Sequence, residues 1–475
     1  MTRAVKSLAH GLIAAWLMGP SAPAAELYTG LTLIDPIAES RTQNAYILVD
    51  AGKIAAIGAG APPAAAEGAE WRDMGGLFAI PGLIDTHAHV TLGTVSGGRD
   101  EKGPYLKANT DPAVTAQSAR MLLAYGITTI RNPGGETGEN LAYERAARVP
   151  GFPGPEALSA GLVIDRTPVR FVGLTDIPTP ERPVKAIVAE QAKAGVDYIK
   201  LYTELTEADL AEGIAAAHAH GIKAIAHLGR VSWTKAVDMG LDALVHMMPI
   251  SPELIAPEKR AAFLAKARPG GWSFFEWYEA VDIDGPEIGA LVKRLAARKV
   301  HVDGTLIAFK LAFWGDDPAF LDAVSATAHP SLIRNWRTVM RFDQGWSKED
   351  YARAKAIWPK ALALTRKMYQ AGVPLTIGTD TPNPFVGPGV SLAYEMALHQ
   401  EAGIPTWAVL RMATSDAARI LGVARKTGRL ARGYEADIAF LAADPSVDAF
   451  NARTVEAVVS NGAFHRADEL KRASP

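Results

Sequence analysis

Short apolar runs alternate with amphipathic stretches through the middle of the chain. Each apolar run is followed by a helical pattern, and strands that alternate with helices form parallel βα units. Eight such units close a (β/α)8 barrel. The pattern therefore predicts an α/β chain with a TIM-like barrel over residues 79–424. The eight strands are expected at Ala79–Thr86, Ile127–Arg131, Ala157–Ser159, Asp197–Tyr202, Lys223–Leu228, Ala243–Met247, Val300–Leu306 and Leu375–Thr379.

Both ends of the chain have a different pattern, made of short strand-like runs separated by turns. Residues 26–78 begin in this style, and residues 425–475 resume it at Ala436–Leu441 and Val455–Ser460. We therefore expect the two ends to form one small β-sandwich domain beside the barrel.

The first 25 residues are typical of a secretory signal peptide. Arg3 and Lys6 precede the apolar run Leu8–Met18, and Ala22-Pro23-Ala24 is an A-x-A cleavage site. The apolar run is too short to span a bilayer. We expect a secreted or periplasmic protein with no membrane attachment after cleavage, and a mature chain that starts near Ala25 or Glu26.

The composition limits which classes of partner and which metal-ligand atoms we expect. The 475 residues have a formal net charge of -2, which gives no reason to expect a nucleic acid. We expect a small-molecule substrate, and a homo-oligomer is left open. The chain has no cysteine, so nitrogen and oxygen atoms must hold any metal.

The first predicted strand ends in a pair of histidines, His87 and His89. Residues two apart in a strand point to the same side, so both rings can face one metal ion. Taken alone, such a pair is weak evidence of a metal site. His218 and His220 have the same spacing but lie in a helical pattern, where such residues do not face each other.

Four further polar residues lie at or near the ends of other predicted strands. Lys200, His227 and His246 belong to strands four, five and six, and Asp380 follows strand eight. The carboxyl ends of barrel strands form the catalytic face. Six nitrogen and oxygen groups that converge there indicate a metal centre.

A cationic Lys200 would be repelled by two divalent ions. A neutral amine that takes up CO2 becomes a carbamate, an anion with two oxygens that can bridge two cations. Together with Asp380 and a bridging hydroxide, it would offset most of the metals' charge. The alternative is an ordinary ion-paired lysine.

The run from Pro81 to His89 and the order HxH, Lys, His, His, Asp resemble the amidohydrolase superfamily. Ile377–Pro382, Met412–Gly422 and Gly433–Ala439 are similar to its later motifs. The context of Lys200 looks most like the imidazolonepropionase- and Xaa-Pro-dipeptidase-related branch, which includes secreted dipeptidases and amidases.

The resemblance implies a role for each ligand. His87, His89 and Asp380 would bind the more buried metal, and His227 and His246 the second. Carboxylated Lys200 and a hydroxide would bridge two divalent ions, with Zn2+ as the default.

We therefore expect a hydrolase of amide or peptide-like C–N bonds that acts on a dipeptide or an N-acyl amino acid. Asp380 would be the general base and then the acid. Tyr202 could donate to the oxyanion or be merely structural, and Arg230 could pair with a substrate carboxylate or simply be exposed.

Other readings stay open. A lactonase or phosphotriesterase would use the same metals, whereas a mononuclear deaminase would not need Lys200. A cyclic-amide hydrolase and a binding protein without turnover are further alternatives.

Two long insertions, residues 251–299 and 313–358, follow strands six and seven and are rich in aromatic residues. They would either line an apolar substrate site as a lid or pack against their own helices.

Overall fold

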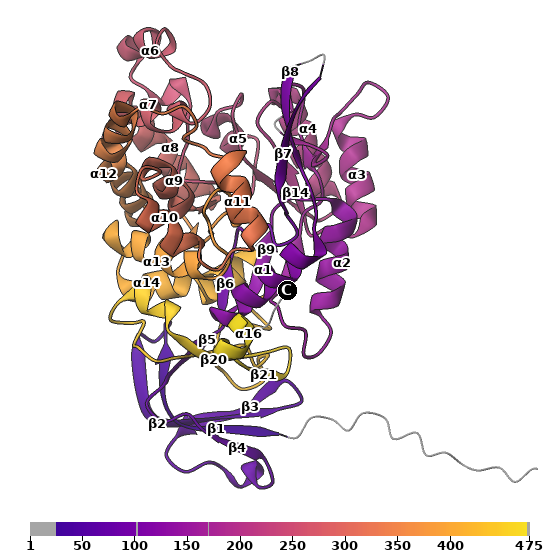
Figure 1. The fold of residues 1–475 in the computed structure, drawn as a ribbon, viewed down its shortest axis with the longest axis vertical. Helices are drawn as coiled ribbons and strands as arrows, with labels where there is room; N and C mark the ends of the chain where they lie inside the picture. Colours follow the sequence, from indigo (N-terminus) through magenta and orange to yellow (C-terminus); the bar gives the residue numbers. More distant parts are fainter. Residues whose placement is uncertain (1–24, 101–102, 170, 473–475) are drawn as a thin grey trace, which may run out of the picture.

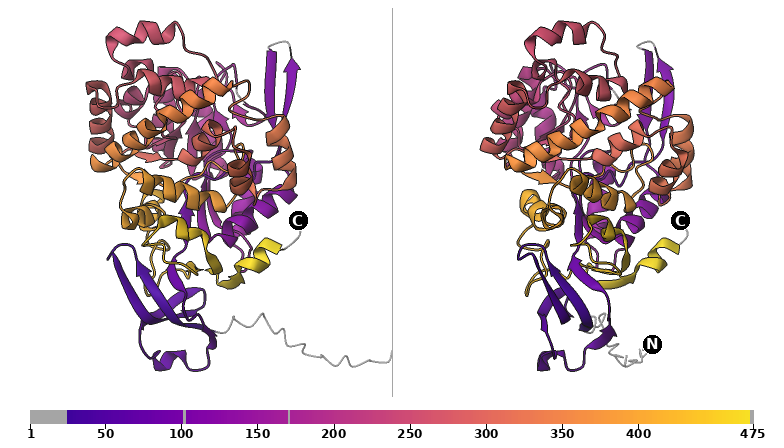
Figure 2. Two further views of the ribbon diagram at one scale, coloured as in Figure 1. Left: turned by 60° about the vertical axis from the view of Figure 1, so that its left-hand side comes forward. Right: turned by 90° about the vertical axis from the view of Figure 1, so that its left-hand side faces the viewer.

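The computed structural model describes residues 25–100, 103–169 and 171–472. A small β-sheet lies at one end of the molecule, and a larger helix-rich body lies above it (Figure 1). The two views of Figure 2 show the same arrangement, with the β7–β8 hairpin (Val95–Asp100 and Gly103–Ala108) at the end opposite the small sheet. The predicted signal peptide lies outside the described residues.

Strands from both ends of the chain join in one hydrogen-bonded sheet. Its order is β21-β20-β19-β5-β1-β2-β3, and β4 pairs with β1. Tyr28, Ile47 and Phe440 are fully buried in a separate apolar core of this sheet. The strands are β1 (Glu26–Asp35), β2 (Ser40–Asp50), β3 (Lys53–Ala59), β4 (Glu70–Asp73), β5 (Phe78–Pro81), β19 (Ile438–Leu441), β20 (Val455–Ser460) and β21 (Ala463–Arg466).

The body contains parallel strands in two groups, which give a TIM-barrel-like α/β fold. One sheet has the order β13-β11-β14-β15-β16-β17-β18, and the other β10-β9-β6. Isolated parallel bridges, Ala160 with Tyr198 and Ala88 with Thr381, connect the two groups at both seams. The strands are β6 (Leu83–Asp85), β9 (Ile127–Asn132), β10 (Glu156–Ser159), β11 (Val163–Ile164), β13 (Thr175–Asp176), β14 (Tyr198–Leu201), β15 (Lys223–Ala226), β16 (Ala243–Val245), β17 (His301–Asp303) and β18 (Leu375–Thr376).

Helices follow these strands and surround them (Figure 1). Side-chain caps fix several of their starts; Thr206 and Ser347 each form a complete capping box with an aspartate three residues on. The helices are α1 (Pro112–Ala124), α2 (Thr137–Ala147), α3 (Val184–Ala194), α4 (Glu207–Ala219), α5 (Trp233–Asp238), α6 (Pro257–Leu264), α7 (Trp272–Ala280), α8 (Pro286–Arg298), α9 (Leu306–Phe313), α10 (Pro318–Ser325), α11 (Pro330–Thr338), α12 (Lys348–Gln370), α13 (Val390–Glu401), α14 (Thr406–Met412), α15 (Ser415–Leu421) and α16 (Ala467–Arg472). Within the described residues, none of them has the length and apolar character of a membrane-spanning segment.

Two predicted strands are wrong in their extent. The expected strand Ala79–Thr86 is two strands: the Gly82 N–H still donates to Asp437 O, next to β19, at 2.8 Å, whereas the Leu83 N–H donates to Gly126 O in the body at 2.8 Å. β5 before it pairs with β19 in the small sheet, and β6 after it pairs with β9 in the body. The expected strand Val300–Leu306 ends at Asp303, because the left-handed backbone of Thr305 (φ 48°) turns the chain into α9.

The aromatic residues of the insertions divide between the two expected roles. Trp277 and Trp336 are fully buried, and Trp346 and Trp358 are nearly so. These tryptophans pack inside the insertions. Phe274 and Phe342, in contrast, line the cavity described below.

Glu395 on α13 holds the start of α9. Its carboxylate accepts the N–H groups of Leu306 at 2.9 Å and Ile307 at 2.7 Å. Burial raises its pKa to about 8. A carboxyl whose pKa is raised by folding gives stability that is complete below its ordinary pKa and is lost as the pH rises towards 8.

We therefore expect Glu395→Gln to weaken the pH dependence of stability. Between pH 5 and 8 the melting temperature of the unmodified protein should fall by about 2–4 °C more than that of the variant. Thermal unfolding at a series of pH values measures this, with the exposed Glu401 of the same helix as the control (Glu401→Gln). Parallel curves for the unmodified protein and Glu395→Gln would contradict it.

Candidate metal centre

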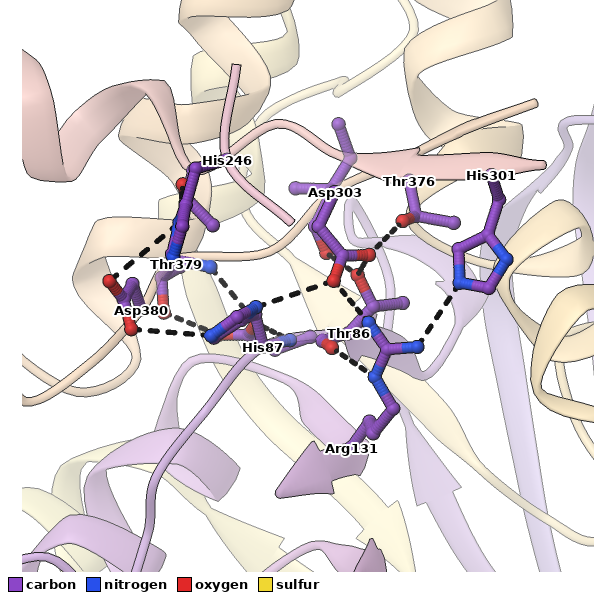
Figure 3. A network of polar contacts seen from close by, with 12 residues as sticks. Thr86, His87, Arg131, His246, His301, Asp303, Thr376, Thr379 and Asp380 are labelled. Carbon is purple, nitrogen blue, oxygen red and sulfur yellow. Dashed lines mark hydrogen bonds and ion pairs between the residues drawn. The ribbon is translucent and has the colours of Figure 1, made fainter. Parts of the chain in front are cut away.

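His87, His89 and Asp380 lie together where β6 and β18 end. Asp380 N donates to His87 O at 2.7 Å, so the backbone joins the two segments. Asp380 Oδ1 lies 3.3 Å from Nε2 of both His87 and His89. One ligand atom from each of the three residues lies within 4.8 Å of the others, which is close enough to share one metal ion. Figure 3 shows His87 between Asp380 and a buried polar network.

Hydrogen bonds fix the orientation of three histidine rings. His87 Nδ1 lies 3.3 Å from Asp303 Oδ2, and His89 Nδ1 lies 2.7 Å from Gly134 O. A carbonyl or carboxylate oxygen can only accept, so both rings donate from Nδ1, and Nε2 of each ring lies toward Asp380. His246 Nδ1 lies 2.7 Å from Thr305 Oγ1, a hydroxyl that can donate or accept. Such outer contacts are the usual support of metal-binding imidazoles.

His227 and His246 form a second group beside the first. Their ring centroids are 4.5 Å apart, and the rings of His246 and His87 are 5.0 Å apart. His246 Nδ1 lies 3.9 Å from Asp380 Oδ2. Burial lowers the pKa of His246 to about 3, so the ring is neutral at physiological pH. A neutral imidazole is the form that binds metal.

Lys200 points into the same cavity from β14. The residue is only 2 % exposed and lines the cavity. Burial, and then the charge of Arg131, lower the pKa of Lys200 to about 7. A substantial neutral fraction of the amine therefore exists near neutral pH, and this is the form that can react with CO2.

Asp380 is an anion in this setting. Burial alone would raise its pKa, but the neighbouring His87 and His246 outweigh burial and hold the pKa of this carboxyl well below its usual range. The donor set therefore comprises four imidazoles, an ionised carboxylate and an amine that is easily deprotonated. This chemistry fits hard or borderline divalent cations.

The sequence analysis did not predict a buried network of hydrogen bonds and an ion pair behind His87. Asp303 accepts hydrogen bonds from Thr86 at 3.0 Å and Thr376 at 2.5 Å and forms an ion pair with the fully buried Arg131. Arg131 Nη1 lies 3.1 Å from His301 Nε2. A partial signal for it was that Arg131 ends one predicted strand and Asp303 lies within another, and the structure places both beside the ligands (Figure 3).

Gly378 provides the space for His87. A Cβ at position 378 would lie 2.7 Å from the Cβ of His87. Any larger residue there would displace the ring from Asp380.

Replacing Asp303 tests the support of His87. We expect Asp303→Asn to lower metal affinity about 10–100-fold, because His87 loses its carboxylate acceptor. Competition with a chromophoric chelator measures the affinity. Asp242 contacts His218 Nε2 at 2.9 Å outside the cavity, so Asp242→Asn is the matched control. Equal metal affinity in the two variants would contradict the role of Asp303.

Of the two residues predicted to contact the substrate, the structure places Tyr202 at the cavity and Arg230 away from it. The ring of Tyr202 lies 5.0 Å from that of His227, and Tyr202 lines the cavity. Arg230 is exposed and is not among the described residues that line the cavity. The structure therefore does not bring Arg230 together with the other site residues. His218 and His220, at the end of α4, likewise do not line it, as their helical pattern predicts.

The cavity has a polar floor and apolar walls. All six predicted metal ligands line the floor. The walls are formed by Leu92, Val163, Phe171, Leu174, Leu228, Met248, Ile250, Phe274, Ala308, Phe309, Met340 and Phe342. The site can thus hold a polar reacting group next to a large apolar group.

Comparisons with known proteins agree with this fold. Residues 301–464 match the model of the Amidohydrolase family. A search of curated protein sequences gave no significant match.

Several solved structures have a similar fold. A bottromycin amidohydrolase is 21 % identical, with a TM-score of 0.68 over 95 % of this chain and 89 % of its own. A Xaa-Pro dipeptidase with methionine in its active site is 18 % identical, with a TM-score of 0.66 over 93 % and 100 %. A putative prolidase from Bifidobacterium longum is 20 % identical, with a TM-score of 0.64 over 94 % and 98 %.

The parallel-strand body and the family match together define a hydrolytic enzyme. The chain is therefore similar in sequence to the Amidohydrolase family over residues 301–464 and similar in fold to the solved structures named above.

Proposed function

We propose that the protein is a metal-dependent hydrolase of amide and peptide-like C–N bonds in small molecules, such as a dipeptide or an N-acyl amino acid. The observation that carries the proposal is the convergence of four histidines, Asp380 and Lys200 on the floor of one cavity. The similarity to a bottromycin amidohydrolase and a Xaa-Pro dipeptidase supports cleavage of amide bonds.

The donor set suits two divalent ions. His87, His89 and Asp380 would hold one, and His227 and His246 the other, with carboxylated Lys200 between them. When bound, the ions, with Zn2+ as the default, would supply Lewis-acid activation of the amide carbonyl and of water. The buried, partly neutral amine of Lys200 is the observation that favours carboxylation.

The protein's own groups would move the protons. Asp380 is ionised and faces the cavity, so it can accept a proton from the attacking water and deliver it to the leaving nitrogen. The Tyr202 hydroxyl could donate a hydrogen bond to the carbonyl oxygen as negative charge develops there. The exposed position of Arg230 gives no support to its predicted contact with a substrate carboxylate, which stays a prediction.

Further parts of the proposal concern the whole chain. We propose that residues 1–25 direct export to the periplasm or the medium and are removed. Residues 26–78 and 425–475 would form the small β domain, as a β-sandwich, and residues 79–424 a closed (β/α)8 barrel. The two bridged seams between the parallel groups support closure. The partner would be a small molecule.

Metal removal tests the proposal. Treatment with a chelator should lower hydrolysis of a panel of dipeptides and N-acyl amino acids more than 100-fold. Zn2+ together with bicarbonate should restore it better than Zn2+ alone, because Lys200 needs CO2 to become an anion. Activity that survives complete metal removal would contradict the proposal. A metal-loaded protein that hydrolyses lactones or phosphotriesters but none of the amides would favour the ester-hydrolase alternative.

A further inference from the structure

We propose that the site selects amides with a bulky apolar group on one side of the scissile bond, and that Phe274, Phe309 and Phe342 determine this preference. The inference rests on the proposed amide hydrolysis and specifies its substrate class. Three observations support it: an aromatic series that begins at a candidate metal ligand, an apolar roof over the cavity, and the rigid support of the helix that carries Phe274.

The aromatic series runs outward from His246. The ring of His246 meets that of Phe309 edge-on, with centroids 5.9 Å apart. The ring centroids of Phe309 and Phe274 are 5.1 Å apart, and those of Phe274 and Phe342 are 5.8 Å apart. In both pairs the ring planes are nearly perpendicular. All three phenylalanines line the cavity. A substrate whose reacting carbonyl lies at the floor would therefore place its neighbouring substituent against these rings.

An apolar roof extends the series to the opposite wall. Phe342, Phe171 and Leu174 all pack against a small apolar cluster that contains Met340. All four residues line the cavity. Phe171 belongs to β12 (Phe171–Val172), which extends the β7–β8 hairpin into a three-stranded sheet. The apolar surface is thus continuous from the metal floor to the hairpin.

The helix that presents Phe274 is firmly held. Phe275, Trp277 and Tyr278, which follow it on α7, are fully buried. Trp277 Nε1 donates to Ser251 O at 2.9 Å, and the Tyr278 hydroxyl donates to Met247 O at 2.6 Å. Met247 directly follows His246, so the wall and the floor are fixed to each other. A rigid wall discriminates by shape better than a mobile loop does.

The size of the effect follows from burial of apolar surface. Each methylene group that leaves water for this wall should raise kcat/KM about threefold to fourfold until the wall is covered. Truncation of Phe274 or Phe342 should make this increase shallower, because the added methylenes then face a gap or solvent.

The test uses the metal-loaded enzyme and two series of substrates. In one series the acyl chain of an N-acyl glycine grows from acetyl to octanoyl, and in the other the side chain of an N-acetyl amino acid grows from alanine to phenylalanine. One of the two series should show the steep increase, and it identifies the side of the bond that meets the wall. Phe274→Ala and Phe342→Ala should at least halve the logarithmic slope of that series. Phe320, half-buried against Tyr394 outside the cavity, provides the control Phe320→Ala.

The outcomes separate this inference from the function on which it rests. The slope is a ratio between substrates, so it does not depend on how much of a variant folds. Hydrolysis that is flat or falls with chain length would overturn the apolar preference and leave amide hydrolysis standing. A steep slope that both truncations leave unchanged would overturn the assignment to these phenylalanines. Hydrolysis of no amide in either series would refute the proposed function itself.

Discussion

Asp380→Asn should lower kcat on the best amide substrate about 10²–10⁴-fold, the range for loss of a general acid–base group. The asparagine keeps an oxygen near the Nε2 atoms of His87 and His89, which Asp380 Oδ1 approaches to 3.3 Å. It can neither accept the proton of the attacking water nor return it to the leaving nitrogen. Most of the metal should remain, because the four histidines and Lys200 are unchanged.

Steady-state kinetics and metal analysis of the same preparation separate these effects. A fall in kcat at nearly full metal content supports a role in proton transfer, whereas a parallel loss of metal would reduce Asp380 to a ligand. Asp242→Asn, which alters an Asp–His contact outside the cavity, should leave kcat unchanged. Wild-type kcat in Asp380→Asn would count against the whole scheme.

Lys200→Ala should remove at least one of two metal ions and nearly all activity. The buried amine lines the same cavity as the four histidines, and its carbamate would supply two of the oxygen ligands. A small carboxylic acid such as formate or acetate could enter the space left by the side chain and restore part of the activity. Metal stoichiometry and rates with increasing formate measure both effects.

Lys223 provides the matched control for this experiment. It lies at the start of the adjacent strand β15, where it is register partner to Tyr198 of β14. Burial lowers its pKa as well, but its ammonium donates to Ile420 O at 2.6 Å, away from the cavity. Lys223→Ala should keep both ions and gain nothing from formate. Two ions and normal rates in Lys200→Ala would exclude a carbamate bridge.

The alternation of strands and helices was readable because the strands of the body are buried on both faces and form short apolar runs. The first strand was misjudged for a physical reason: Phe78–Pro81 and Leu83–Asp85 are both apolar and adjacent, yet they belong to different sheets. Hydrophobicity reports burial, and it does not report which sheet a strand joins. Only Gly82, at the point where the chain leaves one ladder, marks the change.

The ligands were found because each lies at or near the end of a strand, at the same edge of the fold. Asp303 and Arg131 also lie at the ends of their strands, but their ion pair joins segments that are far apart in the sequence, and the sequence does not show that these two side chains meet. The sequence also could not tell which aromatic residues face the cavity. Phe274 and Phe275 are neighbours in α7, yet one lines the cavity and the other is fully buried beneath it.

The pairing of β5 with β19 has a consequence for how the protein is made. Pro81 has Ile438 as its register partner, so β5 has no partner on this side until the last strands have been synthesised. At about 5–20 residues per second, roughly 20–70 s pass between translation of the two strands. During that interval β5 is an unprotected edge strand that other nascent chains can pair with. Chaperone dependence and aggregation during expression should therefore respond to the speed of translation more than to changes near the metal floor.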